Sequence, residues 1–261
     1  MEKKQSNNEE NQKTNDNILS KSVRLISFVE RIHPFFWLAF VIIFLILFIK
    51  FMPHSKWNIF WSVLKSQSLI IAMLLIFCLM AVSLVWSAGQ RIDSMVFRFF
   101  NQDIQHTTHL DGLMLGFSQL GNGIFTMAIA AVLIIGVHHL LAYELVLGTL
   151  TLWLVVELIK VLIHRSRPFN KLQNAKVVGT RERGCSFPSG HTTQAFFTST
   201  LIIHYINANF FIVMILYAIS LLVGITRIYV GAHFPRDVFA GAILGSVWGM
   251  IGVIINNFIF R

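Results

Sequence analysis

Apolar residues gather into seven long runs that cover most of the chain after residue 34. A helix needs about 20 apolar residues to cross a bilayer core of roughly 30 Å, and most of these runs reach that length. Because open sheet edges cannot exist in hydrocarbon, we expect every crossing to be a helix. The runs that predict the crossings are 35–52, 68–88, 119–137, 140–163, 192–206, 209–226 and 236–259.

The run at 192–206 differs from the others because it contains several hydroxyl and amide side chains. Such groups are unfavourable against lipid but acceptable where they face other helices. We therefore expect this helix to be buried in the bundle, close to a polar site. The residues concerned are Thr192, Thr193, Gln194, Thr198, Ser199 and Thr200.

The polar segments divide the chain further. Residues 1–34 are polar and have no periodicity, which predicts a disordered tail without the form of a signal peptide. We expect residues 35–65 to form an additional N-terminal transmembrane helix and loop, and residues 66–261 to form the core. Residues 89–112 place apolar side chains at helical spacing beside arginines, which favours a short amphipathic helix at the membrane interface over an ordinary solvated loop.

Composition supports a membrane protein. The chain is 55% hydrophobic and only 13% charged, and its mean hydropathy of +0.67 exceeds what one soluble domain tolerates. The net charge of +9 suits anionic lipid headgroups, a phosphorylated substrate or nucleic acid, and membrane burial argues against nucleic acid. The two cysteines, Cys78 and Cys185, form neither a disulfide framework nor a metal site.

Three clusters of polar residues are candidates for chemistry: residues 160–168, 188–191 and 227–237. One polar loop joins the first two clusters, and two crossings separate the second from the third. An even number of crossings returns the chain to the same side, so all three clusters should lie at one membrane surface. The loop at 164–191 carries six cations against a single acid, Glu182, which predicts anion binding.

In the first cluster, Lys160 and Arg167 are seven residues apart. On a helix this spacing is close to two turns, about 10 Å of rise, with both cations on nearly the same face. Pro168 disfavours helix at Arg167, so we expect this arginine at the helix end with its guanidinium free to bind phosphate oxygens. The alternative is that Lys160 extends to the interface and Arg167 is an ordinary loop charge.

The second cluster, Pro188-Ser189-Gly190-His191, precedes a predicted helix. Ser189 is a suitable cap, and free backbone amides at a helix start bind anions. Gly190 would allow a phosphate to approach the backbone, with His191 beside it. A plain helix cap is the alternative interpretation.

In the third cluster, His233 and Asp237 are four residues apart near a helix start. An aspartate that accepts one ring N–H fixes the tautomer and leaves the other nitrogen as a nucleophile or base. Arg227 would provide another phosphate contact. A structural His–Asp pair is the alternative.

Together, the clusters resemble the type 2 phosphatidic acid phosphatase superfamily, whose pattern is K-x6-RP, PSGH and SR-x5-H-x3-D. All spacings match, with Thr226 in place of the usual serine. The resemblance implies an all-α fold, a polytopic membrane helix bundle with a six-helix core plus one additional N-terminal segment. It also implies hydrolysis of a terminal phosphate of a lipid phosphate or diphosphate through a phosphohistidine, with no metal and no cofactor.

The resemblance also implies residue roles. His233 is similar to the nucleophile, Asp237 to the group that orients it, and His191 to the general acid that protonates the leaving oxygen. The positions that resemble the phosphate pocket are Lys160, Arg167, Ser189, Gly190 and Arg227.

Other activities and several substrates stay open. Vanadate-dependent haloperoxidases share this pocket but are soluble, and a transporter could use Glu144, Glu157 and Lys160 as a charge relay unless the last two neutralise each other. Undecaprenyl diphosphate, phosphatidylglycerol phosphate, phosphatidate and diacylglycerol diphosphate all present the same terminal phosphate.

Two arguments about the membrane side that the active site faces give opposite answers. Ten Lys and Arg residues lie on the motif side of the core and four on the other side. A literal positive-inside rule would therefore place the motif side in the cytosol. Several of these cations are needed for phosphate, and bacterial members of the family usually face outward. We therefore expect a multi-pass protein of the cell membrane with its active site at the outer face.

Overall fold

The computed structural model describes residues 66–135 and 139–259, with side chains to residue 255, so the predicted tail at 1–34 and the predicted crossing at 35–52 lie outside the described residues. All the regular elements within the described ranges are helices, which confirms the all-α prediction. They are α4 (Ser68–Ser83), α5 (Ser87–Arg98), the π-helical η1 (Phe99–Asp103), α6 (Thr108–Gln119), α7 (Gly123–Ile135), α8 (His139–Ile163), α9 (Pro168–Lys171), α10 (Gly190–Tyr205), α11 (Phe210–Tyr229) and α12 (Pro235–Ile259).

Several of the described helices are long and apolar enough to cross a membrane. Three segments qualify alone, built on α8, α11 and α12. Up to five qualify if the bent pairs α4–α5 and α6–α7 each form one span. The predicted crossing at 192–206 appears as α10, whose 16 residues fall short of a full span. A multi-pass membrane protein is therefore confirmed, while the total of seven crossings stays a prediction.

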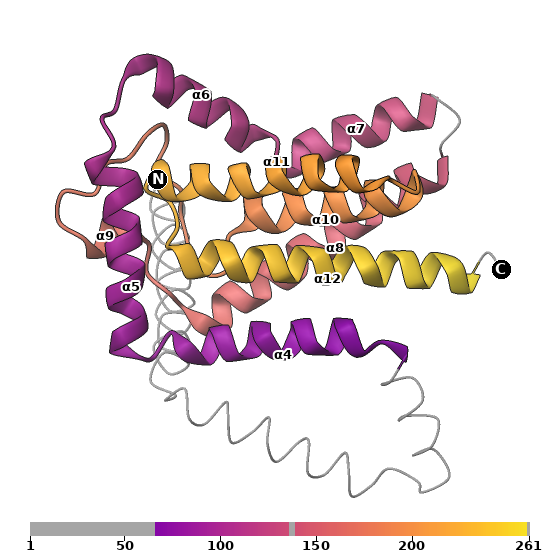
Figure 1. The fold of residues 1–261 in the computed structure, drawn as a ribbon, viewed down its shortest axis with the longest axis horizontal. Coiled ribbons are helices and arrows are strands. Elements are labelled where there is room, and N and C mark those ends of the chain that lie inside the picture. The colour runs from indigo at the N-terminus through magenta and orange to yellow at the C-terminus, as the bar shows by residue number, and fades with distance from the viewer. Residues whose placement is uncertain (1–65, 136–138, 260–261) are drawn as a thin grey trace, which may run out of the picture. The chain divides into compact units, whose positions relative to one another are not determined.

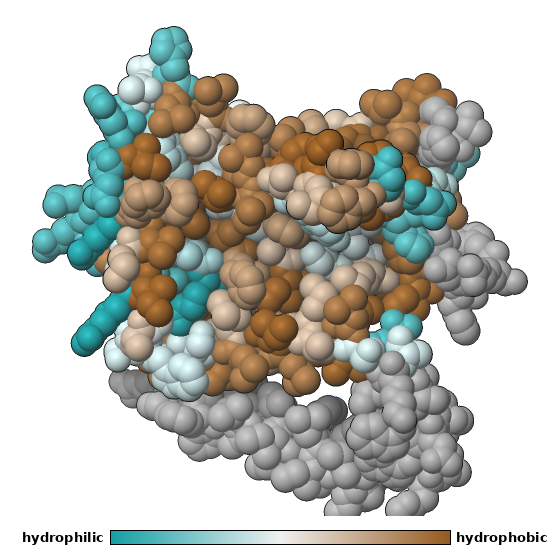
Figure 2. All heavy atoms as spheres, viewed as in Figure 1, coloured by the Kyte–Doolittle hydropathy of each residue, from teal (hydrophilic) through white to brown (hydrophobic). Residues whose placement is uncertain are grey.

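The outer faces of the long helices suit lipid. Figure 2 shows apolar residues over the middle of the visible face and hydrophilic residues gathered towards the ends of the bundle. One side of α8 exposes a set of large apolar residues that water would solvate poorly and lipid would accommodate. These are Leu147, Leu150, Trp153, Leu154 and Leu158.

Helix α10 lies inside the bundle and packs most extensively against α12, with α11 and α8 on its other sides (Figure 1). All six of its predicted polar residues are buried, as expected. Gln194 donates hydrogen bonds to Thr126 on α7 (3.0 Å) and Thr149 on α8 (2.9 Å). The polar face of α10 therefore bonds to other helices instead of facing lipid.

Glycines on α12 allow this close packing. A Cβ atom on Gly245 would lie 2.1 Å from the carbonyl oxygen of Thr193, and one on Gly241 would lie 2.8 Å from that of Ser189. Backbones can approach this closely only where the side chain is absent. As a result the two helix starts lie together, and the Ser189 amide donates to the Asp237 carbonyl at 3.0 Å.

The predicted interfacial segment at 89–112 is more broken than expected. Helix α5 meets α4 at 95° and, in Figure 1, lies across the end of the bundle. It continues through η1, and residues 104–107 separate it from α6. Asp93 on α5 is buried, and accepts from Arg165 and from Arg236 Nε (2.7 Å). These bonds tie α5 to the loop that follows α8 and to the start of α12.

Candidate active site

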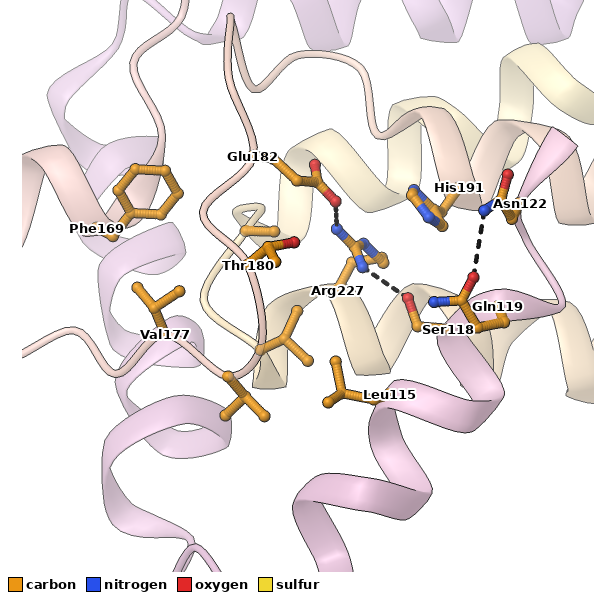
Figure 3. A pocket seen from close by; sticks show the side chains of 13 residues that line it. Leu115, Ser118, Gln119, Asn122, Phe169, Val177, Thr180, Glu182, His191 and Arg227 are labelled. Atoms are coloured by element: carbon orange, nitrogen blue, oxygen red, sulfur yellow. Dashed lines mark hydrogen bonds and ion pairs between the residues drawn. The ribbon is translucent and has the colours of Figure 1, made fainter. Parts of the chain in front are cut away.

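A cavity of about 230 Å³ opens at the end of the bundle where the motifs lie. Its wall comes from α6, the loop between α9 and α10, the first turn of α10 and the last turn of α11. His191, Arg227 and Glu182 line it together, and Glu182 binds Arg227 directly (Figure 3). Residues from the second and third clusters therefore meet at one end of the bundle, as the count of crossings predicted.

Arg167 reaches this site from an extended backbone. Helix α8 ends at Ile163, and Arg167 has φ −72° and ψ 156°. The prediction that Lys160 and Arg167 share one helical face is therefore wrong, because the helix stops four residues before the arginine. The prediction that the arginine lies beyond a helix end is confirmed.

The Arg167 guanidinium is almost completely buried and holds the loop in place. Its Nε donates to the Gly184 carbonyl at 3.1 Å, and Nη2 donates to the Arg183 carbonyl at 3.2 Å. Its Nη1 lies 2.8 Å from Glu182 Oε2 and 3.3 Å from His233 Nε2. One arginine thus connects the loop, an acid and the candidate nucleophile.

Lys160 is paired with an acid on its own helix. Its ammonium donates to Glu157 at 2.8 Å, so these two residues neutralise each other, which weakens a charge relay through α8. The lysine is nevertheless close enough for its charge to lower the pKa of His191. Its effect on the pocket is therefore electrostatic in this structure.

His233 is buried with one ring nitrogen fixed by the backbone. Its Nδ1 lies 2.7 Å from the carbonyl oxygen of Ser186, which can only accept a hydrogen bond, so we assign the ring proton to Nδ1. This tautomer leaves a lone pair on Nε2, which faces Arg167 Nη1. A neutral imidazole with an unprotonated Nε2 can act as a nucleophile.

Asp237 does not make the hydrogen bond to His233 that the sequence suggested. Its Oδ2 is 3.7 Å from His233 Nδ1, too long for a hydrogen bond, and instead accepts from the Phe234 amide at 2.8 Å. That bond closes the first turn of α12 in the manner of a capping box. The predicted hydrogen bond between Asp237 and His233 is therefore wrong, because the Ser186 carbonyl binds Nδ1 instead, although the carboxylate stays within ion-pair distance of the ring.

The second carboxylate oxygen of Asp237 binds Arg165, which also binds Asp93 on α5. The Arg165 guanidinium lies over the Phe234 ring, 4.4 Å from its centroid. Arg165 therefore connects α5, the loop after α8 and the turn that carries His233.

The PSGH segment begins α10 as predicted, although Ser189 makes no side-chain cap. Its hydroxyl accepts from Thr192 Oγ1 at 2.9 Å. A Cβ atom added at Gly190 would meet nothing within 4 Å, so the backbone there is open to a close approach.

His191 follows in the first turn of α10, outside the candidate membrane spans. Burial and then the charge of Arg227 lower the pKa of His191 to about 3, against the opposing charge of Glu182. The ring is therefore neutral at pH 7 in the resting site.

Arg227 completes the cavity from the last turn of α11. Its Nη1 donates to Ser118 Oγ on α6 at 2.6 Å, and its Nη2 binds Glu182 (Figure 3). Its buried Nε finds no partner among the described residues. This leaves a donor available for a bound anion.

The sequence did not assign roles to several residues that contact the site. Glu182 was visible as the single acid of a basic loop, and Arg165 as one of its cations. The Ser186 carbonyl has no sequence signature, because every residue carries one. Within the described residues, no cluster of three or more His, Cys, Asp or Glu residues could hold a metal ion.

Two buried arginines and a histidine with an unprotonated ring nitrogen can bind and attack a phosphate, and the apolar bundle is that of a membrane protein, so the fold and site define a membrane enzyme of the phosphatase class. The sequence profile of the PAP2 superfamily matches residues 141–261, and the chain belongs to this superfamily. It is accordingly a hydrolase of phosphoric monoesters or diphosphates that acts on lipid phosphates.

Three similar proteins illustrate this membership. An undecaprenyl-diphosphatase from Sulfolobus acidocaldarius is 30% identical over 150 residues, which cover 57% of this chain and 71% of that protein. A PAP2-type phosphatidylglycerolphosphate phosphatase from Bacillus subtilis has a TM-score of 0.65 and 24% identity over 74% of this chain and 98% of that one. Aquifex aeolicus LpxE has a TM-score of 0.55 and 31% identity over 61% and 93% of the respective chains.

Proposed function

We propose that His233 removes the terminal phosphate of a lipid phosphate or diphosphate through a phosphohistidine. The observation that carries this proposal is the tautomer of His233, whose Nδ1 is bonded to a carbonyl while Nε2 faces Arg167. The Arg167 and Arg227 guanidiniums bind the phosphate oxygens and stabilise the charge of the transition state. The open backbone at Ser189 and Gly190 lets the phosphate approach the start of α10, and Lys160 adds positive charge nearby.

The reaction has two steps. In the first, His233 Nε2 attacks phosphorus, the bond from phosphorus to the leaving oxygen breaks, and His191 donates a proton to that oxygen. In the second, His191 accepts a proton from water, the water oxygen bonds to phosphorus, and the P–N bond breaks to regenerate His233 and release phosphate. His191 needs a proton for the first step, and the negative charge of the bound substrate raises its pKa above the low value of the resting site.

Asp237 acts by positioning and electrostatics in this mechanism. Its carboxylate fixes the turn at Phe234 and anchors Arg165, both next to His233. Its charge at 3.7 Å also favours the positive ring that forms when Nε2 bonds to phosphorus.

For the substrate we propose an isoprenoid diphosphate or phosphatidylglycerol phosphate, with phosphatidate as the next candidate. The support comes from an undecaprenyl-diphosphatase and a phosphatidylglycerolphosphate phosphatase among the similar proteins. The bilayer would deliver the lipid laterally to the cavity.

Phosphate release from purified protein in detergent tests this function. We expect turnover of at least one of these three lipids, and we expect it to persist in excess EDTA, because side-chain cations perform the charge stabilisation. Activity that disappears in EDTA and returns with Mg²⁺ would contradict the metal-free mechanism. No release from any of the three lipids would contradict the proposed substrate class.

We further propose that the protein lies in the cell membrane with this site at the outer face, because four arginines on the motif side are paired with acids of the protein and so need not mark the cytosolic side. They are Arg165, Arg167, Arg227 and Arg236. Asn170 is exposed on that side and is a suitable labelling position. In a variant without Cys78 and Cys185, a cysteine at position 170 should react with a membrane-impermeant maleimide in intact cells. Reaction only after the cells are permeabilised would place the site inside.

A further inference from the structure

Glu182 lies where a substrate phosphate should bind. Its Oε2 is 2.8 Å from Arg167 Nη1, and its Oε1 binds Arg227 Nη2. Oε2 also lies 3.7 Å from His233 Nε2, the nitrogen assigned to the attack. Figure 3 shows the carboxylate above the Arg227 guanidinium, inside the cavity. Each carboxylate oxygen thus contacts one of the two arginines assigned to phosphate.

A carboxylate and a phosphate bind arginine in the same way, through two negatively charged oxygens that accept N–H bonds. Both anions cannot occupy the same N–H groups at once. If the phosphate entered while Glu182 stayed, the carboxylate would also repel it at close range in a largely buried site. The phosphate must therefore displace Glu182 before His233 can attack.

The loop around Glu182 permits this displacement. The residue lies between Gly179 and Gly184, whose φ angles of +82° and +79° are in the region that glycine favours. Arg167 holds the carbonyls of Arg183 and Gly184, so the backbone after Glu182 stays anchored. The Glu182 side chain is 28% exposed, so it can rotate out to solvent without unfolding the loop.

Protonation does not open the site. Burial alone would raise the pKa of Glu182, but the positive charges of Arg227 and Arg167 hold that pKa well below its usual range. The carboxylate therefore stays ionised across the working pH range, and only a competing anion can remove it.

We propose that Glu182 is a built-in competitor for the phosphate pocket, which makes the enzyme selective for phosphate groups carried on a lipid. The proposal rests on the proposed function, in which Arg167 and Arg227 bind phosphate. A lipid substrate adds binding energy from its acyl or prenyl chain and can displace the carboxylate. Inorganic phosphate and small soluble phosphate esters lack this contribution and are kept out.

The test compares wild type with Glu182→Gln, which keeps the side-chain shape and removes the charge. We expect the inhibition constants for orthovanadate and inorganic phosphate to fall at least about tenfold at pH 7. The KM for p-nitrophenyl phosphate should fall more than the KM for the lipid substrate. Asp103→Asn is the matched control, because Asp103 is an exposed acid of η1 that does not line the cavity. Its inhibition constants should equal those of wild type.

Thermal unfolding in detergent gives a second readout. Without ligand, Glu182→Gln should unfold at a lower temperature than wild type, because two buried arginines lose their partner. Orthovanadate should then raise its unfolding temperature by more than it raises that of wild type. If Glu182 had only a structural role, Glu182→Gln would lower the unfolding temperatures with and without orthovanadate equally. The increase that orthovanadate produces would then be the same as in wild type.

The outcomes separate the two proposals. If wild type neither binds vanadate nor releases phosphate, the proposed function is wrong. If wild type binds vanadate and Glu182→Gln binds it equally or more weakly, the competitor role is wrong. Should Glu182→Gln fail to fold, Glu182→Asp replaces it in the same comparison. The shorter aspartate cannot bridge both arginines, so the Glu182→Asp enzyme should also bind vanadate more tightly than wild type.

Discussion

Replacing His233 by alanine should reduce lipid phosphate hydrolysis to background, a loss on the order of 10⁶-fold, the scale seen when an enzyme loses its nucleophile. Alanine removes the ring nitrogen that faces Arg167. Phosphate release from the purified variant and from wild type checks this result, after thermal unfolding has shown that the two proteins are equally stable.

His109→Ala is a suitable control for the loss of a histidine at this end of the bundle. His109 is exposed on α6 and does not line the cavity. Its activity should match that of wild type. If His233→Ala kept a tenth of the wild-type activity, another group would have to be the nucleophile.

Replacing His191 by alanine should cost roughly 10² to 10⁴-fold in kcat on a phosphate monoester, the usual contribution of a general acid. The loss should be smaller on a lipid diphosphate, because a phosphate leaving group needs less protonation than an alkoxide. Parallel kinetics on phosphatidate and on a prenyl diphosphate measure this difference. Equal losses on both substrates would show that His191 does not protonate the leaving group.

The pH dependence provides an independent check on His191. Its pKa of about 3 in the resting site leaves it neutral at pH 7, and the acidic form that catalysis needs develops once the phosphate dianion is bound. Because kcat reports the enzyme–substrate complex, its decline at high pH should follow deprotonation of His191 in that complex. This alkaline decline should disappear in His191→Ala.

The long membrane helices could be predicted from sequence because an apolar run long enough for a bilayer has few other stable conformations. Helices α8, α11 and α12 match the predicted runs closely. The end of the helix in the run at 68–88 was harder to predict, because α4 ends at Ser83 and α5 continues at 95° to it. Asp93 on α5, outside this run, is buried and binds Arg165 and Arg236, and these bonds hold α5 across the end of the bundle.

The motif residues could be located from sequence because their order and spacing are constrained, whereas their individual contacts could not. A seven-residue interval suggested one helical face for Lys160 and Arg167, but α8 ends between them. A four-residue interval suggested a bond between His233 and Asp237, but a backbone carbonyl from the loop took that place. Glu182 was visible only as an isolated acid, since its two arginine partners come from distant segments.

Rapid-quench labelling with a ³²P-labelled lipid substrate tests the role of His233 most directly. A phosphohistidine mechanism predicts an acid-labile label on wild-type protein that forms and decays within a turnover and maps to the peptide containing His233. The label should be absent from His233→Ala, which retains Arg167 and Arg227 to bind the substrate. Wild-type turnover without any trapped label, or an acid-labile label that persists in His233→Ala, would contradict a covalent intermediate at this residue.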